Sequence, residues 1–189
     1  MHTISYAHCE GFTDLCFADN GKFLTTGEDG DVRIWDGFDD TDNTSIRVGD
    51  KCFAIGYKSG KIYVADELNE LKKYDLETNE FQGVITSFTL PITSVSVNKS
   101  NTFLVCGSSD FEIHLVELST LKVTSFTGHD APILSICYDP FEKYFVSASC
   151  DGTARFWSVQ TLVTVKTLSE LHSKSNDFID SESSCKIAW

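Results

Sequence analysis

The sequence predicts an all-β fold in which four-stranded antiparallel sheets repeat as the blades of a β-propeller. Two segments, 23–35 and 145–157, share one pattern: an apolar strand, an Asp-Gly turn, and an alternating strand that ends in Trp. Asp-Gly between alternating hydrophobic residues is a strong hairpin signal, because Gly readily takes the positive φ that the turn requires. The third-strand ends recur at intervals of 39, 42 and 41 residues, and a period of about 40–45 residues is typical of four-stranded propeller blades.

Two further copies of this repeat are weaker. Residues 103–116 keep Asp110 six positions before the end of the segment, whereas residues 61–74 keep only the strand–turn–strand outline. The four copies end at Trp35, Tyr74, Val116 and Trp157. Because each blade buries its apolar faces only against neighbours, we expect consecutive blades at about residues 8–45, 46–86, 87–127 and 128–170.

Both ends of the sequence contain further candidate strands. Residues 3–6 have the form of an N-terminal strand that completes the last blade of a closed ring, and residues 171–189 have the form of the start of a fifth blade. Four blades and one strand leave a seven-bladed ring incomplete. The sequence therefore predicts a C-terminally truncated propeller whose uncovered apolar faces favour aggregation.

A His precedes each of the two strong copies at nearly the same distance. His8 stands 21 residues before Asp29, and His129, after Gly128, stands 22 residues before Asp151. This Gly-His, Asp-Gly and Trp order resembles the blade signature of the WD40 family. The resemblance implies one hydrogen-bond chain of Trp, hydroxyl, His and Asp in each strong blade, made by His8, Thr25, Asp29 and Trp35 in the first and by His129, Ser147, Asp151 and Trp157 in the fourth.

The same side chains also resemble a hydrolase triad, His129, Ser147 and Asp151, with His8, Thr25 and Asp29 as a Thr variant. Repetition in two blades favours a structural role, because a catalytic site is normally made once. Burying a polar group without a partner costs about 1–3 kcal/mol, so such chains stabilise a blade. We therefore expect no enzymatic activity, no cofactor and no metal site.

Composition excludes several other classes of protein. The 189 residues carry 28 Asp and Glu against 15 Lys and Arg, a formal net charge of −13, so direct binding to DNA phosphates is not expected of this segment. No apolar run reaches the length of a membrane span, and the N-terminus lacks the basic start of a signal peptide. Seven cysteines include no CxxC pair, and we interpret them as small buried hydrophobic residues in a reducing compartment, not as zinc ligands.

Four carboxylates follow the first Trp, at Asp36, Asp39, Asp40 and Asp42. They lack the alternate spacing, central Gly and terminal Glu of a calcium-binding loop. We interpret this stretch as a solvated loop after the third strand of the first blade. The alternative interpretation is a docking point for a basic segment of a partner protein.

Several stretches resemble one branch of the WD40 family. The most specific are residues 107–111, Gly-Ser-Ser-Asp-Phe, and residues 128–132, Gly-His-Asp-Ala-Pro. Over about residues 9–189 the chain is similar to the N-terminal propeller of the WD repeat and HMG-box DNA-binding family, whose yeast members are chromosome transmission fidelity factors. The resemblance implies a nuclear replisome adaptor that links the replicative helicase to DNA polymerase α on chromatin.

The resemblance assigns the other activities of that family to regions outside these residues. In the family, a second propeller-containing region trimerises and grips helicase and polymerase peptides, and an HMG box binds DNA. The alternative is a WD40 substrate receptor of a cullin-type ubiquitin ligase, or another generic WD40 scaffold. Such receptors often carry Trp-Asp-x-Arg, but Trp35-Asp36 and Trp157-Ser158 are not followed by that Arg. Protein partners are expected, and neither a membrane nor a small-molecule substrate is.

Overall fold

The computed structural model describes residues 8–36 and 43–169, which form four four-stranded antiparallel sheets. The first sheet contains β1 (Phe12–Phe17), β2 (Lys22–Gly27), β3 (Asp31–Asp36) and β4 (Asn43–Arg47). The second contains β5 (Cys52–Lys58), β6 (Lys61–Asp66), β7 (Glu70–Asp75) and β8 (Phe81–Ser87). A single 3-10 turn, η1 (Asp19–Gly21), joins β1 to β2.

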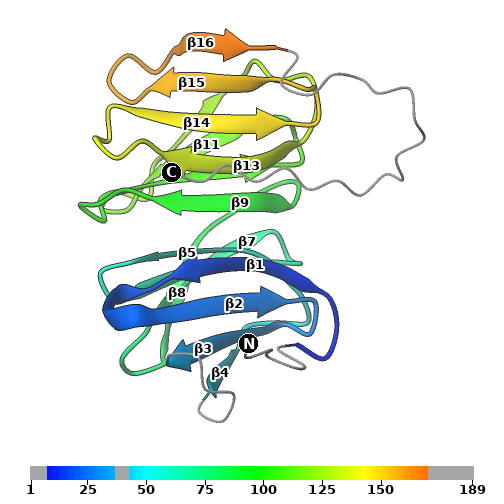
Figure 1. Ribbon diagram of the computed structural model, residues 1–189, viewed down its shortest axis with the longest axis vertical. Helices are drawn as coiled ribbons and strands as arrows, with labels where there is room; N and C mark the ends of the chain where they lie inside the picture. Colours follow the sequence, from blue (N-terminus) through cyan, green and yellow to red (C-terminus); the bar gives the residue numbers. More distant parts are fainter. Residues whose placement is uncertain (1–7, 37–42, 170–189) are drawn as a thin grey trace, which may run out of the picture.

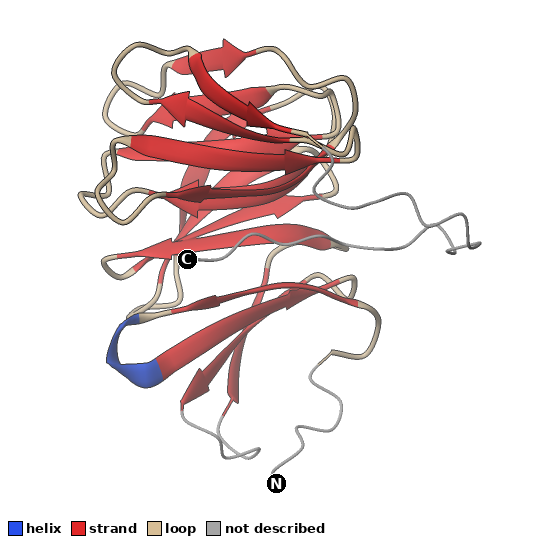
Figure 2. Ribbon diagram, turned by 45° about the horizontal axis from the view of Figure 1, so that its top comes forward, coloured by secondary structure: helices blue, strands red, loops and turns tan. Residues whose placement is uncertain are grey.

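The third and fourth sheets have the same organisation. The third contains β9 (Ile92–Val97), β10 (Phe103–Ser108), β11 (Ile113–Glu117) and β12 (Val123–Phe126). The fourth contains β13 (Ile133–Tyr138), β14 (Tyr144–Ser149), β15 (Ala154–Ser158) and β16 (Thr164–Leu168). In each sheet the strands are neighbours in chain order, so each sheet is a meander of hairpins (Figure 2).

The sheets follow one another as propeller blades. Strand β5 contacts β1 and β9, and β9 contacts β13, so the first strands of the four sheets lie beside one another along the interior. Figure 1 shows the first two sheets in the lower half of the molecule and the last two in the upper half. The described sheets do not close into a ring. Four four-stranded sheets stacked in this way confirm the predicted all-β, incomplete propeller.

The hydrophobic core consists of three layers, one between each pair of neighbouring sheets. Leu24 of the first sheet packs with Ile62 of the second, Tyr63 of the second packs with Leu104 of the third, and Phe145 of the fourth joins the third layer. Middle strands such as β6 are therefore buried on both faces, whereas the outer strands β8 and β16 are largely exposed. This pattern follows from stacking, because a sheet between two neighbours has no polar face.

The Asp-Gly turns behave as the sequence predicts. Gly30 and Gly152 have φ of 74° and 81° at the ends of β2 and β14. The weaker copies make the same turn with Asn69 at φ 60° and Phe111 at φ 73°. The turn therefore forms even where the sequence lacks Gly. Asn takes this conformation readily, whereas Phe takes it at a backbone strain of about 1–3 kcal/mol.

Strand ends differ slightly from the expected blade limits. Strand β4 runs to Arg47 and β8 to Ser87, because Arg47 pairs with Asp31 and Ser87 with Glu70 across their sheets.

The candidate strands at residues 3–6 and within 171–189 lie outside the described residues. Within the described ranges, no helix has the length and apolar character that crossing a membrane requires.

The cysteine interpretation is correct for strand positions and wrong for two loop positions. All six cysteines of the described residues are free. Cys52 and Cys106 are buried, and Cys16 and Cys137 are half-buried, whereas Cys9 and Cys150 are exposed. Cys9 lies before β1, and Cys150 lies in the turn between β14 and β15, so neither is a strand residue. Cys185 lies outside the described residues.

Candidate functional site

The fourth blade contains a chain of three side-chain hydrogen bonds. Trp157 Nε1 donates to Ser147 Oγ at 2.8 Å, and Ser147 Oγ lies 2.7 Å from His129 Nε2. His129 Nδ1 lies 2.7 Å from Asp151 Oδ2. Because the Trp N–H occupies an acceptor position of the hydroxyl, the hydroxyl proton is directed to His129 Nε2 and the ring donates from Nδ1 to the carboxylate.

The first blade repeats this arrangement. Trp35 Nε1 donates to Thr25 Oγ1 at 3.0 Å, Thr25 Oγ1 lies 2.9 Å from His8 Nε2, and His8 Nδ1 lies 2.7 Å from Asp29 Oδ1. The backbone N–H of Cys9 also donates to Asp29 Oδ2 at 2.9 Å. The structure therefore brings together all eight side chains that the resemblance to WD40 blades selected.

The electrostatics of the fourth-blade chain favour a neutral ring beside an ionised carboxylate. Burial raises the pKa of Asp151, but hydrogen bonds from Thr153, His129 and Asp130 outweigh it and lower the pKa from 3.8 to about 2. Burial lowers the pKa of His129 despite the nearby Asp151 carboxylate. At neutral pH the chain therefore consists of neutral donors that end on one anion.

Burial distinguishes this chain from a hydrolase triad of similar geometry. Ser147 is 0% exposed, and its hydroxyl accepts the indole N–H of Trp157, a residue of the third core layer. A serine nucleophile needs a free approach to the substrate carbonyl and a nearby oxyanion site. The geometry therefore ties a loop to two strands and gives no substrate access to the hydroxyl.

The second blade replaces the chain with an ion pair that the sequence analysis missed. Asp66 is fully buried, and Lys72 Nζ lies 2.5 Å from its Oδ2. By strand pairing, Asp66 stands where the first blade has Gly27, a position at which a Cβ atom would lie 2.5 Å from His8 Nδ1. The second blade has Val48 in place of that His, so the space admits a carboxylate.

The third blade keeps the turn Asp but changes its partner. Asp110 Oδ2 lies 3.0 Å from His114 Nε2, and His114 Nδ1 lies 2.9 Å from Ser125 Oγ. Phe88 takes the place of the loop His and packs against the His114 ring in a tilted arrangement, with ring centroids 4.9 Å apart. Aligning the copies on their turns would have shown these exchanges, because each replaces a residue at an equivalent position.

Only one member of the acidic loop is described. Asp36 ends β3, and Lys22 Nζ lies 3.4 Å from its Oδ2, with the Asp36 side chain 65% exposed. The positions of Asp39, Asp40 and Asp42 lie outside the described residues. The loop therefore stays a prediction.

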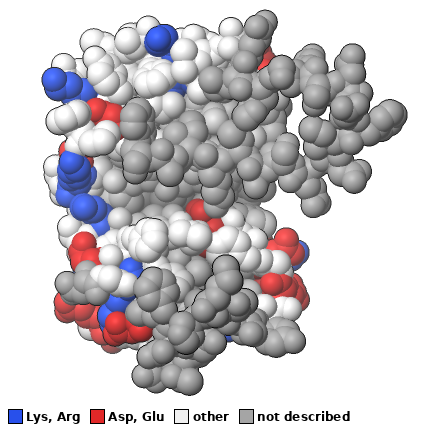
Figure 3. Space-filling model, viewed as in Figure 1, with Lys and Arg blue, Asp and Glu red and all other residues white. Residues whose placement is uncertain are grey.

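A second acidic region lies at the loops that join the first two sheets. Glu67 Oε1 accepts a hydrogen bond from the Asp50 backbone N–H at 2.9 Å, and Lys51 Nζ lies 3.2 Å from Glu28 Oε2. Figure 3 shows Asp and Glu gathered over the lower half of the visible face, where the first two sheets lie, with Lys and Arg mainly along one edge of the upper half. Charge is therefore unevenly distributed.

The first strands of the four sheets line a groove of about 510 Å³. Its walls combine apolar side chains such as Leu15, Val95 and Ile136 with small polar ones such as Thr93 and Ser94. The groove contains no His among its lining residues. Its largely apolar lining suits contact with a peptide or with further protein.

The four stacked sheets and the two Trp-hydroxyl-His-Asp chains define a WD40 repeat protein. The family model described as the WDHD1 first WD40 domain matches residues 5–189, and the chain belongs to this family.

Curated relatives agree with this assignment. The chain is 41% identical over 189 residues to WD repeat and HMG-box DNA-binding protein 1 of Xenopus laevis, covering 97% of this chain and 16% of that protein. It is 38% identical over 186 residues to the Mus musculus protein of the same name, covering 97% of this chain and 17% of that protein. A more distant likeness, 28% over 154 residues, is to the Gallus gallus serine-threonine kinase receptor-associated protein, covering 79% of this chain and 43% of that protein. The chain thus spans less than a fifth of the first relatives.

Proposed function

We propose that this chain is a non-catalytic protein-interaction scaffold of a nuclear DNA replication adaptor that links the replicative helicase to DNA polymerase α on chromatin. The observation that carries the proposal is the similarity over 97% of the chain to WD repeat and HMG-box DNA-binding protein 1. A WD40 fold alone indicates protein–protein interaction and no particular partner.

The distribution of charge supports protein contacts and argues against DNA contacts by this segment. The net charge of −13 repels phosphates, and the acidic loops at Glu28, Asp50 and Glu67 offer carboxylates to a basic partner. We infer that association with chromatin belongs to other regions of the longer protein. The segment should show no salt-dependent retention on a DNA column.

A recovery experiment from replicating nuclear extract tests the proposal. The full chain is immobilised, and bound proteins are probed for replicative helicase subunits, for polymerase α and for the adaptor of cullin-type ligases. Recovery of helicase or polymerase α supports the adaptor role. Recovery of the ligase adaptor without either of them would replace it with the substrate-receptor alternative.

A matched pair of variants tests whether the acidic loops make the contact. Asp50→Lys and Glu67→Lys together reverse charge at the loops between the first two sheets, whereas Glu77→Lys and Glu80→Lys reverse charge in the β7–β8 connection. We expect the first pair to abolish recovery of the partner and the second to preserve it. Equal loss in both would indicate a general charge effect.

A further inference from the structure

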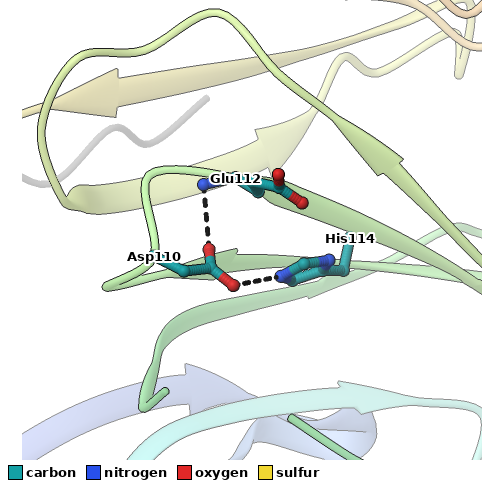
Figure 4. Close-up of side chains that lie close together, drawn as sticks. All are labelled: Asp110, Glu112 and His114. Atoms are coloured by element: carbon teal, nitrogen blue, oxygen red, sulfur yellow. Dashed lines mark hydrogen bonds and ion pairs between the residues drawn. The ribbon is translucent and has the colours of Figure 1, made fainter. Parts of the chain in front are cut away.

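Three side chains with metal-binding chemistry converge where β10 turns into β11 (Figure 4). Asp110 lies in the turn, and Glu112 and His114 follow at alternate positions. One ligand atom of each lies within 4.8 Å of the others. A carboxylate, a second carboxylate and an imidazole are ligands that Zn²⁺ accepts, with bonds of about 2.0–2.2 Å.

The charge of this cluster differs from that of the equivalent turns in the other blades. The position of His114 in strand three carries Arg33, Lys72 and Arg155 in the first, second and fourth blades. Asp29 lies 3.6 Å from Arg33, and Asp66 lies 2.5 Å from Lys72. The third blade therefore replaces a permanent cation with a side chain that is neutral in its metal-binding form.

Glu112 likewise lacks the cationic partner that its counterparts have in the first two blades. Asp31, which stands where the third blade has Glu112, lies 3.3 Å from Arg47, and Glu70 lies 3.7 Å from Lys72. Neither Lys nor Arg pairs with Asp110 or Glu112 among the residues that the structure describes. Within the described part of the chain, two half-buried carboxylates thus lie near one imidazole with no Lys or Arg paired to them, and a divalent cation would supply the positive charge.

Hydrogen bonds already hold the ligands in place. Without a metal, His114 Nε2–H donates to Asp110 Oδ2 at 3.0 Å, and the Ser125 hydroxyl, 2.9 Å from Nδ1, donates to that nitrogen. With a metal bound, the ring proton would stand on Nδ1 and be donated to Ser125 Oγ, which frees the Nε2 lone pair for the metal. Asp110 Oδ1 accepts the Glu112 backbone N–H at 2.9 Å, which leaves Oδ2 facing the ring. Metal-ligating His residues are usually oriented by such a second hydrogen bond.

We propose that Asp110 Oδ2, His114 Nε2 and a Glu112 carboxylate oxygen bind one Zn²⁺ ion on the third blade. The Asp110 Oδ2 to His114 Nε2 distance of 3.0 Å is close to the separation of about 3.3 Å between two ligands of a tetrahedral zinc ion. A carboxylate oxygen of the half-buried Glu112 lies within 4.8 Å of the other two ligand atoms, so rotation of this side chain would bring it to the ion, and water would complete the coordination. The ion ties the strained turn at Phe111 to β11.

Titration of the full chain with Co²⁺, which reports tetrahedral coordination by visible absorption, and with Zn²⁺ by calorimetry tests the proposal. We expect one equivalent of metal to bind with nitrogen and oxygen ligands, and Zn²⁺ to raise the melting temperature. Glu112→Gln and His114→Gln should each abolish the tetrahedral Co²⁺ spectrum. Ser125→Ala should weaken binding by about 10- to 100-fold, because it removes the partner that orients the ring.

Glu117→Gln is the matched control, because Glu117 lies on the same strand and its carboxylate accepts hydrogen bonds from Ser119 and Thr120 in the next turn. It should bind metal as the unaltered chain does. Circular dichroism verifies that each variant is folded, and Glu112→Gln, at a half-buried position, keeps the test valid if His114→Gln unfolds. Undiminished binding in Glu112→Gln, or a sulfur-to-cobalt charge-transfer band that marks cysteine ligands, overturns the proposal.

Discussion

At the residue scale, one buried hydroxyl joins two strands and a loop in the fourth blade. Ser147 Oγ accepts from Trp157 Nε1 and lies 2.7 Å from His129 Nε2, so its donor and one acceptor position are both used. The loop before β13 is thereby fixed to β14 and β15. Thr25 makes the same connection in the first blade. These hydroxyls are therefore structural groups, and their removal should lower the stability of the fold.

Ser147→Ala should lower the free energy of unfolding by about 1–3 kcal/mol, because it leaves the buried Trp157 N–H and His129 Nε2 without partners. Urea denaturation measures the loss. Ser119→Ala, at an exposed turn position, is the control and should change stability by less than about 0.5 kcal/mol. Equal stability of both variants would show that the chain contributes nothing.

The carboxylate that ends this chain gives the fold an acid dependence of defined sign. The pKa of Asp151 is lowered from 3.8 to about 2, so the folded state holds its proton less tightly than the unfolded state does. Its contribution, about 2 kcal/mol, is fully present above pH 3.8 and is lost as the pH falls toward 2. Unfolding measured from pH 5 to pH 2 should show a shallower acid loss in Asp151→Asn than in the unaltered chain. A parallel loss in both would contradict this assignment.

At the element scale, the sequence predicted the turns and strands better than the contacts that fix them. The Asp-Gly turns and the repeat interval of about 41 residues located the first and fourth blades, because a turn motif can be recognised from neighbouring residues alone. The Asp66–Lys72 pair was not predicted, because it depends on two compensating exchanges in different parts of the chain. The second blade has the smaller Val48 where the first blade has a His, and the buried Asp66 carboxylate fills the space that this leaves. His114 was missed because it stands where the other blades have Arg or Lys, and the exchange leaves the strand pattern of the third blade unchanged.

The two Asp-Gly turns offer a matched test of how neighbouring loops restrict a blade. A Cβ atom at Gly30 would lie 2.1 Å from the Gly49 carbonyl oxygen, whereas at Gly152 nothing lies within 4 Å. Both glycines have positive φ, so Ala introduces a similar backbone strain of about 1 kcal/mol at each position. Gly152→Ala should therefore show that strain alone in chemical denaturation, and Gly30→Ala should lose clearly more. Equal losses would mean that the loop at Gly49 moves away freely.

At the scale of the whole molecule, the stacked sheets leave apolar side chains uncovered. Phe12, Leu15 and Phe17 on β1 are 51%, 49% and 77% exposed, and Phe141 beside β13 is 82% exposed. Exposed apolar residues grouped on one strand favour association, whereas single ones are common on soluble proteins. The three on β1 therefore form the stronger candidate for self-association.

The chain should accordingly bind a hydrophobic dye and self-associate with increasing concentration in sedimentation experiments. Leu15→Ser with Phe17→Ser should reduce both, because the two side chains alternate on one face of β1 and leave their hydrogen-bonded backbone unchanged. Leu68→Ser is the control, since Leu68 is 64% exposed but lies alone in the β6–β7 turn. A soluble monomer with one cooperative melting transition at all concentrations would contradict this prediction, since burial within the three interior layers would then suffice without further cover for β1.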